Sequence, residues 1–336
     1  MIELSELRDA AQKAFPADVL APPRDASWHL ITEMGWLMID LPENDGGLAL
    51  GAAAEATLHY ELGRVLSRAP LIPALLGLSA IVESPDFAGR AEWIEQIVAG
   101  AHVPLNLLPG KVERSVDGAL TGRVSGVFDA DLATHAVGGL GALYVLIPLD
   151  APGVSVQEQP LWDESRRIFD IELTSYKPDR AHILAEGDAA RVLHDKLGPA
   201  AQLALAADSL GGAEAALTAS VEYLKTRSQF DRPLAMFQAL KHRAADLKTR
   251  ITAAEALLWA TLGNPAVSRA DAGAAKALAC DVYAFVTEEM VQFHGGIGLT
   301  DEHASHLFLK RAQLNQWLAG GSDVLNEAAG RALLAG

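Results

Sequence analysis

The segment that decides the fold runs from Leu203 to Lys248 and reads LALAADSLGGAEAALTASVEYLKTRSQFDRPLAMFQALKHRAADLK. The first half carries apolar residues in steps of three, four or seven, which predicts one long helix with a single buried face. These residues are Leu203, Ala207, Leu210, Leu217, Val221 and Leu224. The pattern then breaks, and a second helix is expected after Pro233, with Phe237, Leu240, Ala244 and Leu247 on its buried face.

The break between these helices collects a guanidinium group, two amides and an aromatic ring at one corner. They belong to Arg227, Gln229, Phe230 and Gln238. A guanidinium group pairs well with phosphate, and such a set can also cover a ribose or an aromatic ring. From these residues alone, the corner is equally compatible with a nucleotide contact and with an ordinary helical corner that has a surface arginine.

The corner resembles the R-x-x-F-G-x-P…F-Q signature of acyl-CoA dehydrogenases, with Asp231 in place of the usual glycine. In that family the signature opens the C-terminal helical bundle. It contacts the ADP half of an FAD that is held mainly by the neighbouring subunit. The resemblance thus implies FAD as the cofactor and a second subunit as its main holder.

A second motif, Q-x-x-G-G-x-G, supports the same family and consists of Gln292, Gly295, Gly296 and Gly298. Glycines let the backbone approach a ligand closely and take positive φ angles, and the glutamine can hydrogen-bond a ribose or pyrophosphate oxygen. The resemblance implies that Gln292, Gly295 and Gly296 meet the same ADP group. His294 and His303 have no carboxylate or cysteine at a metal-ligand spacing, so we expect a structural role and no metal.

The order of patterns along the chain predicts an α+β fold of the acyl-CoA dehydrogenase type in three domains. Residues 1–103 read as a helical domain that contains GWLMIDLPENDGG, similar to the family's "GW…PE..GG" marker. Residues 104–188 alternate apolar and polar positions between Gly, Pro and Asp breaks, which predicts a small antiparallel β-domain. Residues 189–336 are helical again and are expected to form a four-helix bundle.

The β-domain lacks two segments that contact the flavin ring in conventional members, T-E-P-x-x-G-S-D and W-[IV]-[TS], so it is expected to be truncated. The family's catalytic base is a glutamate in one of two places, which correspond here to Ala319 and Ala201. Neither alanine can accept a proton, so no catalytic residue is assigned. Two carboxylates, Glu214 and Asp323, remain as weaker candidates for a base.

These losses resemble the short non-catalytic subunits of heteromeric (α2β2) bacterial acyl-CoA dehydrogenases, several of which act on steroid-derived CoA thioesters. The resemblance implies a heterotetramer with a second acyl-CoA dehydrogenase subunit that carries the glutamate, an acyl-CoA substrate, and electron-transfer flavoprotein as the electron acceptor. Two alternatives stay open. One is a self-sufficient homo-oligomeric flavoprotein with a non-standard base, and the other is a non-redox binding or structural protein on the same fold.

Composition limits the partners further. A formal net charge of −16 over 336 residues argues against nucleic acid and anionic membranes. The single cysteine, Cys280, lies in an Ala-rich pattern and is expected to be a small buried residue in a reducing compartment. The acidic start lacks the features of a signal peptide, and the apolar run 69–82 is short and contains Pro70 and Pro73. We therefore expect a cytoplasmic protein.

Overall fold

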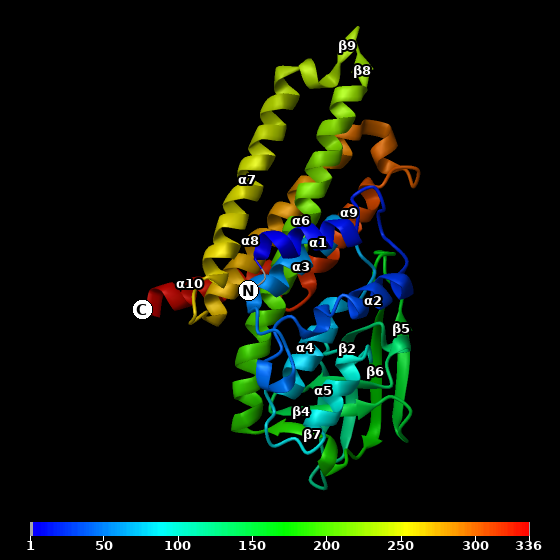
Figure 1. Cartoon of the computed structure of the whole chain (residues 1–336), viewed down its shortest axis with the longest axis vertical. Coiled ribbons are helices and arrows are strands. Elements are labelled where there is room, and N and C mark those ends of the chain that lie inside the picture. Colours follow the sequence, from blue (N-terminus) through cyan, green and yellow to red (C-terminus); the bar gives the residue numbers. More distant parts are fainter. Residues whose placement is uncertain (1–2, 336) are drawn as a thin grey trace. The chain divides into compact units, whose positions relative to one another are not determined.

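The computed structural model describes residues 3–335, which form helices at both ends of the chain and strands in the middle (Figure 1). The N-terminal helices are α1 (Leu4–Ala14), α2 (Arg24–Glu33), α3 (Ala52–Arg64), α4 (Leu71–Val82) and α5 (Arg90–Val98). The C-terminal helices are α6 (Asp188–Thr226), α7 (Gln238–Leu262), α8 (Arg269–His294), α9 (Ser305–Trp317) and α10 (Ser322–Ala335). This arrangement confirms the predicted α+β fold class.

The strands between the two helical regions form two antiparallel sheets, as the alternating pattern predicted. One sheet has the order β1-β2-β6-β5 and consists of β1 (Lys111–Arg114), β2 (Leu120–Phe128), β5 (Val154–Gln159) and β6 (Ile168–Tyr176). The other has the order β3-β4-β7 and consists of β3 (His135–Gly139), β4 (Leu143–Pro148) and β7 (Ile183–Glu186). The sheets share one apolar core that contains Val124, Val145, Ile147 and Ile171.

The chain divides into two compact units by its internal contacts. One, here called the bundle unit, comprises the residues up to Pro22, residues 56–67 and residues 202–336. The other, the sheet unit, comprises residues 23–55 and 68–201. All residues of the two predicted flavin-contact motifs belong to the bundle unit.

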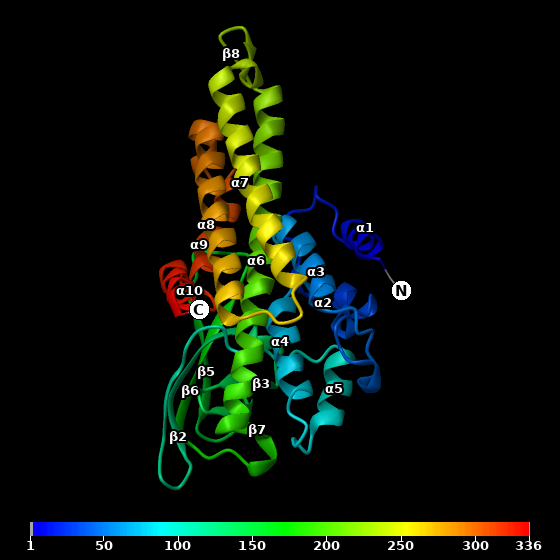
Figure 2. The ribbon, with the colours of Figure 1, turned by 90° about the vertical axis from the view of Figure 1, so that its left-hand side faces the viewer.

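The bundle unit is organised around α6, α7 and α8, which run alongside one another in both views (Figures 1 and 2). The predicted apolar face of α6 is its core: Leu210 is fully buried, and Leu203, Leu217 and Leu224 are nearly so. A small residue on α6 leaves room for a large ring on α8. Gly212 shows this, since an added Cβ would lie 2.4 Å from the ring of Tyr283 on α8.

A polar network is buried within this core. The Arg311 side chain on α9 is fully buried and donates to Asp208 Oδ1 at 3.3 Å and to the Ser67 carbonyl at 3.2 Å. Asn315, one turn later, donates to Asp208 Oδ2 at 2.8 Å and to Ser209 Oγ at 3.0 Å. Because these charges are paired and hydrogen-bonded, the network ties α6 to α9.

Among the described residues, no helix is both long and apolar enough to span a bilayer, and no group of histidine, cysteine and acidic side chains is arranged to bind a metal ion. Cys280 is fully buried, as expected, and its thiol lies 3.5 Å from Ser209 Oγ.

Candidate flavin-contact surface and the position of the base

The predicted corner forms a tight two-residue turn between β8 (Ser228–Gln229) and β9 (Arg232–Pro233). Phe230 and Asp231 occupy its centre with φ angles of 53° and 60°. Left-handed backbone is costly for most residues but is tolerated by aspartate and free for glycine. This geometry explains why the family signature has glycine where this chain has Asp231.

Aromatic contacts hold the turn at the end of the bundle. The Arg232 guanidinium lies 4.0 Å from the ring centre of Phe237, and the ring of Phe230 meets Phe237 edge-on at 6.2 Å. Phe230 is nevertheless 86% exposed. Gln229 is exposed and donates to the Ser228 carbonyl at 2.9 Å. The turn therefore presents its ring and its amide outward.

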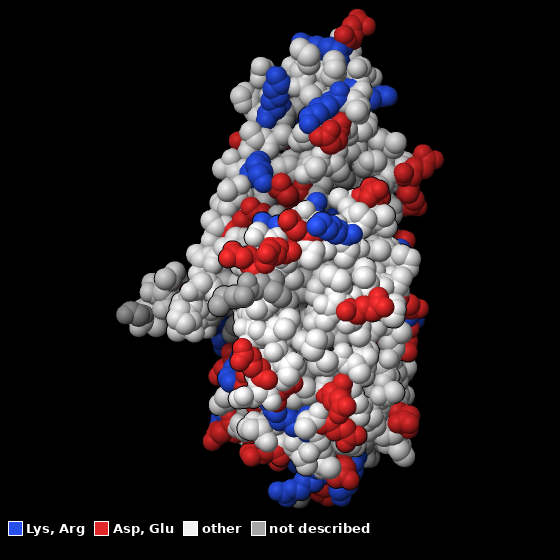
Figure 3. Space-filling view, in the orientation of Figure 1, with Lys and Arg blue, Asp and Glu red and all other residues white. Residues whose placement is uncertain are grey.

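Basic side chains surround the turn, although the protein as a whole is strongly acidic. Lys225, Arg227, Arg232 and Lys241 are all exposed, and Figure 3 shows blue side chains gathered at this end of the bundle. Within residues 3–335, Lys225 has an ion-pair partner in Glu222, whereas Arg227 has none. The Arg227 guanidinium is therefore available to an external anion.

The second motif lies at the end of α8, toward the same end of the bundle as the turn in both ribbon views (Figures 1 and 2). Gln292 is exposed on the last turn of α8, and Gly295 and Gly296 are exposed at the start of η6 (Gly295–Leu299). Gly295 has φ 62° and ψ −138°, a conformation open in practice only to glycine. Gly298 is buried, and a Cβ there would lie 2.8 Å from the Val291 carbonyl oxygen.

Gly296 differs from Gly295 and Gly298 because neither its backbone nor its surroundings restrict the side chain. Its φ lies outside the left-handed region, and an added Cβ would meet no atom within 4 Å. Neither the backbone conformation nor the packing of this chain requires glycine at this position. A close approach by a molecule outside the chain would require it.

Two stacked imidazoles and a tyrosine ring support the motif from inside. His294 and His303 lie 4.0 Å apart between ring centres, and Tyr223 lies 4.3 Å from His294. Nδ1 of His294 faces the Met290 carbonyl at 2.7 Å, while Nδ1 of His303 accepts from the Ser305 amide at 3.1 Å. Burial lowers the pKa of both rings. The lowered pKa favours the neutral form of both rings, which pack against each other and, through His294, against Tyr223.

The expected base positions hold no carboxylate. Ala201 is buried on α6, and Ala319 lies in the loop between α9 and α10 with φ 52°. Gln202, the residue after Ala201, donates through Nε2 to the Ala319 carbonyl at 3.3 Å. At the two positions where we expected a base this chain therefore has alanine, and the residue beside Ala201 is an amide.

A buried lysine forms hydrogen bonds to the loop that carries Ala319. The sequence analysis did not predict this contact. Lys276 on α8 is fully buried, and its Nζ donates to the Gly320 carbonyl at 2.6 Å and to the Gln316 carbonyl at 2.9 Å. Burial lowers the pKa of this ammonium group. The available signal was a single lysine within the Ala-rich run of α8, which the periodicity places on its buried face.

The two substitute carboxylates are poorly placed for the role of a base. Glu214 on α6 is paired with Lys248 of α7, whose Nζ lies 2.8 Å from its Oε2. Asp323 is exposed in the first turn of α10, where a negative charge stabilises the helix N-terminus. Neither carboxylate is therefore assigned as the base.

Comparison with family models gives two matches. The model described as the N-terminal domain of acyl-CoA dehydrogenase matches residues 5–101, and the model for the C-terminal domain matches residues 200–334. The second match contains every predicted flavin-contact residue and Ala319.

Full-length relatives agree with these matches. The chain is 31% identical to the acyl-CoA dehydrogenase IpdE2 of Mycolicibacterium smegmatis, over 87% of this chain and 83% of the relative. It is 30% identical to IpdE2 of Mycobacterium tuberculosis, over 86% of this chain and 80% of the relative. Among solved structures, the steroid ACAD Tcur3481–Tcur3483, in a variant form, superposes with a TM-score of 0.85 and 26% identity, over 99% of this chain and 98% of that one. The ChsE4–ChsE5 complex of Mycobacterium tuberculosis has a TM-score of 0.86 at 23% identity, over 99% and 98% of the two chains, and shows the shared fold.

Proposed function

Because the chain belongs to the acyl-CoA dehydrogenase family, we propose that it is the non-catalytic subunit of a heteromeric, FAD-dependent acyl-CoA dehydrogenase. In this proposal it contacts the ADP half of an FAD held mainly by a second subunit. That partner carries the catalytic glutamate. The observation that carries the proposal is the contrast between an outward-facing set of flavin contacts and alanine at both positions of the base.

The contact residues fit the ADP part of FAD in chemistry and in exposure. Arg227 is an exposed cation suited to a pyrophosphate, and Gln292 offers an amide at the end of α8. Gly296 leaves open space where a ligand can touch the backbone. The remaining contacts that we propose are Gln229, Phe230, Gln238 and Gly295.

FAD, when bound, supplies the hydride acceptor for α,β-dehydrogenation of a CoA thioester. The residues of this chain would bind and orient its ADP end, and the proton from the α carbon would go to the partner's glutamate. In this chain Ala319 and Ala201 offer no group that could take that proton. The chain therefore contributes binding and orientation to catalysis.

The relatives support both the partner and the substrate class. ChsE4–ChsE5 is a complex of two differently named chains, and Tcur3481–Tcur3483 is a steroid ACAD. We infer by similarity a heterotetramer with a second acyl-CoA dehydrogenase chain and a steroid-derived acyl-CoA as substrate. A further solved structure that resembles this chain in fold is described as the electron-transferring flavoprotein of Acidaminococcus fermentans. We propose such a flavoprotein as the electron acceptor.

Expression of the chain with and without its partner tests the proposal. Alone, the chain should purify without flavin, and with the partner the complex should be yellow and should reduce its flavin when acyl-CoA is added. A flavin-containing homo-oligomer that turns over acyl-CoA by itself would instead establish the self-sufficient enzyme. A complex that never binds flavin would establish a binding or structural role.

Removing the substitute carboxylates tests the missing base separately. Glu214→Gln and Asp323→Asn should each leave turnover of the complex within about tenfold, or roughly 1.4 kcal/mol of barrier. A true general base contributes more, about 10²–10⁴-fold. Loss of flavin reduction in Asp323→Asn alone would contradict the proposal.

A further inference from the structure

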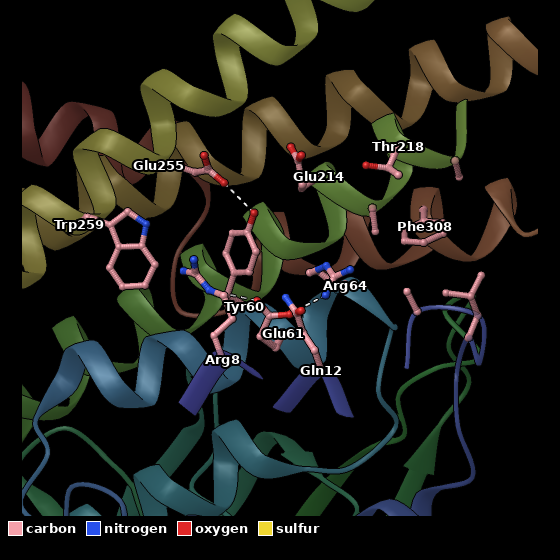
Figure 4. A pocket seen from close by; sticks show the side chains of 14 residues that line it. Arg8, Gln12, Tyr60, Glu61, Arg64, Glu214, Thr218, Glu255, Trp259 and Phe308 are labelled. Carbon is pink, nitrogen blue, oxygen red and sulfur yellow. Dashed lines mark hydrogen bonds and ion pairs between the residues drawn. The ribbon is translucent and has the colours of Figure 1, made fainter. Parts of the chain in front are cut away.

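The bundle unit contains a cavity of about 600 Å³ that none of the proposed flavin contacts lines. Side chains from α1, α3, α6, α7 and α9 surround it (Figure 4). This volume is within the range of small-molecule sites, which typically combine an apolar surface with a few convergent polar groups. The cavity has both features, and its two arginines lie on the opposite side from Glu214 and Glu255 (Figure 4).

The first wall carries two guanidinium groups around one buried carboxylate. Glu61 is only 2% exposed, and it lies 2.6 Å from Arg64 Nη1 and 3.4 Å from Arg8 Nε. Figure 4 shows the two arginines on the α1 and α3 side of the cavity, together with Gln12. Because one carboxylate faces two cations, this wall retains positive charge and suits an anionic group such as a carboxylate.

The second wall is negative. Glu255 of α7 accepts a 2.6 Å hydrogen bond from the Tyr60 hydroxyl, and Glu214 of α6 lies on the same side in Figure 4. Burial raises the pKa of Tyr60, and the hydrogen bond to Glu255 and the charges of Glu255, Glu214 and Glu61 raise it further. Lys248 already places an ammonium group against Glu214 from outside the cavity. An ammonium group inside the cavity would meet Glu255 in the same way.

Between the walls lie apolar and aromatic surfaces from Trp259, Phe308, Ala215 and Ala219. Trp259 adjoins Glu255 on α7, so an ammonium group at Glu255 would also lie near an indole ring, which attracts cations. The cavity thus offers an anion site, a cation site and a surface for an apolar side chain.

We propose that this cavity binds a small zwitterion of the amino-acid class, with its carboxylate at Arg8 and Arg64 and its ammonium group at Glu255 and Glu214. A simple anion would meet three carboxylates, and a simple amine would leave the excess positive charge of the first wall, where two arginines share Glu61, without a counter-charge. Acyl-CoA, with its several phosphates, fits a cavity lined by Glu61, Glu214 and Glu255 poorly. None of the proposed flavin contacts lines this cavity, and neither do the expected base positions Ala201 and Ala319.

Three ligands that share a phenylethyl group test the proposal: L-phenylalanine, 2-phenylethylamine, which lacks the carboxylate, and 3-phenylpropionate, which lacks the ammonium group. Isothermal titration calorimetry with the full chain should show binding of phenylalanine, with the amine and the acid each at least tenfold weaker. No binding of phenylalanine, or an amine or acid that binds as tightly, would overturn the assignment.

Variants of the two walls give a second readout that does not depend on overall stability. Arg8→Gln should abolish the preference for phenylalanine over the amine, and Glu255→Gln should abolish the preference over the acid. If the Glu255→Gln variant does not fold, the Glu214→Gln variant is used in its place. Glu222→Gln, in the exposed pair with Lys225 on α6, is the matched control and should change neither preference. Preferences that survive in both wall variants would overturn the proposal.

Discussion

Lys276 Nζ donates a 2.6 Å hydrogen bond to the Gly320 carbonyl, from a side chain that is fully buried. A second bond of 2.9 Å to the Gln316 carbonyl makes this ammonium group the anchor of the loop that carries Ala319. We expect Lys276→Met to lower the free energy of unfolding by about 1–3 kcal/mol, since it leaves two partly buried carbonyls without this donor. Urea denaturation measures the change.

The matched control for that variant is Lys225→Met, which changes an exposed lysine paired with Glu222. It should change the unfolding free energy by less than about 0.5 kcal/mol. Equal effects of the two substitutions would show that the buried lysine does not anchor the loop.

The Phe230–Asp231 turn gives a second prediction. Because Asp231 has φ 60°, Asp231→Gly should raise the free energy of unfolding by up to about 1 kcal/mol, and Asp231→Val should lower it by about 1–2 kcal/mol. Thermal unfolding of the two variants distinguishes these outcomes. A valine variant as stable as the wild type would mean that the turn has a different conformation in solution.

Gly296 and Gly298 should respond to alanine in opposite ways. Gly298→Ala should destabilise the chain, because its Cβ would lie 2.8 Å from the Val291 carbonyl oxygen and 3.0 Å from the Cβ of His294. Gly296→Ala should leave the stability of the chain alone within about 0.5 kcal/mol. It should nevertheless weaken FAD binding by the complex, since the added methyl group would occupy space that we assign to the ligand. Unimpaired FAD binding by the Gly296→Ala complex would remove this glycine from the site.

Asp129 gives a prediction for pH. Its side chain is 1% exposed, and burial raises its pKa to about 6, although Arg24 at 2.9 Å opposes the shift. Between pH 3.8 and 6 the unfolded chain has lost this proton and the folded chain still holds it. The stabilising contribution of Asp129 is therefore complete below pH 3.8 and is lost as the pH rises through 6.

Asp129→Asn removes this contribution, and asparagine tolerates the φ of 49° at this position. From pH 4 to 6, the unfolding free energy of the wild type should fall relative to that of the variant by about 1–3 kcal/mol. Asp117→Asn should show the opposite sign and at lower pH, because Ser115 and Lys177 lower the pKa of Asp117, so that its stabilising contribution is lost as the pH falls below 3.8. Parallel curves for the wild type and Asp129→Asn would contradict the expectation.

The fold could be predicted from local patterns. The three- and four-residue spacing between Leu203 and Leu224 describes a buried helical face, and that face is the core of the bundle. The alternating apolar and polar residues between Leu120 and Phe128 likewise form a strand with one buried side. Such patterns suffice because each depends on residues that are neighbours in the chain.

Contacts between distant residues could not be predicted in this way. The partners of Lys276 are backbone carbonyls about forty positions away, and any residue type could provide them. The cavity around Tyr60 joins side chains from five helices, and its separation of charge exists only once these helices are packed. The flavin-contact residues could be proposed because they form short motifs, but the open space at Gly296 required the structure.

The count of FAD per assembled complex tests the central claim most directly. If this chain only donates contacts to a flavin held by its partner, a heterotetramer with two copies of each chain should release two FAD on denaturation. Arg227→Ala should weaken that binding about ten- to a hundredfold, since a charge-assisted bond to phosphate is worth about 1.5–3 kcal/mol, while Lys225→Ala should not. Four FAD per tetramer, or an Arg227→Ala complex that retains flavin through gel filtration like the wild type, would contradict the account.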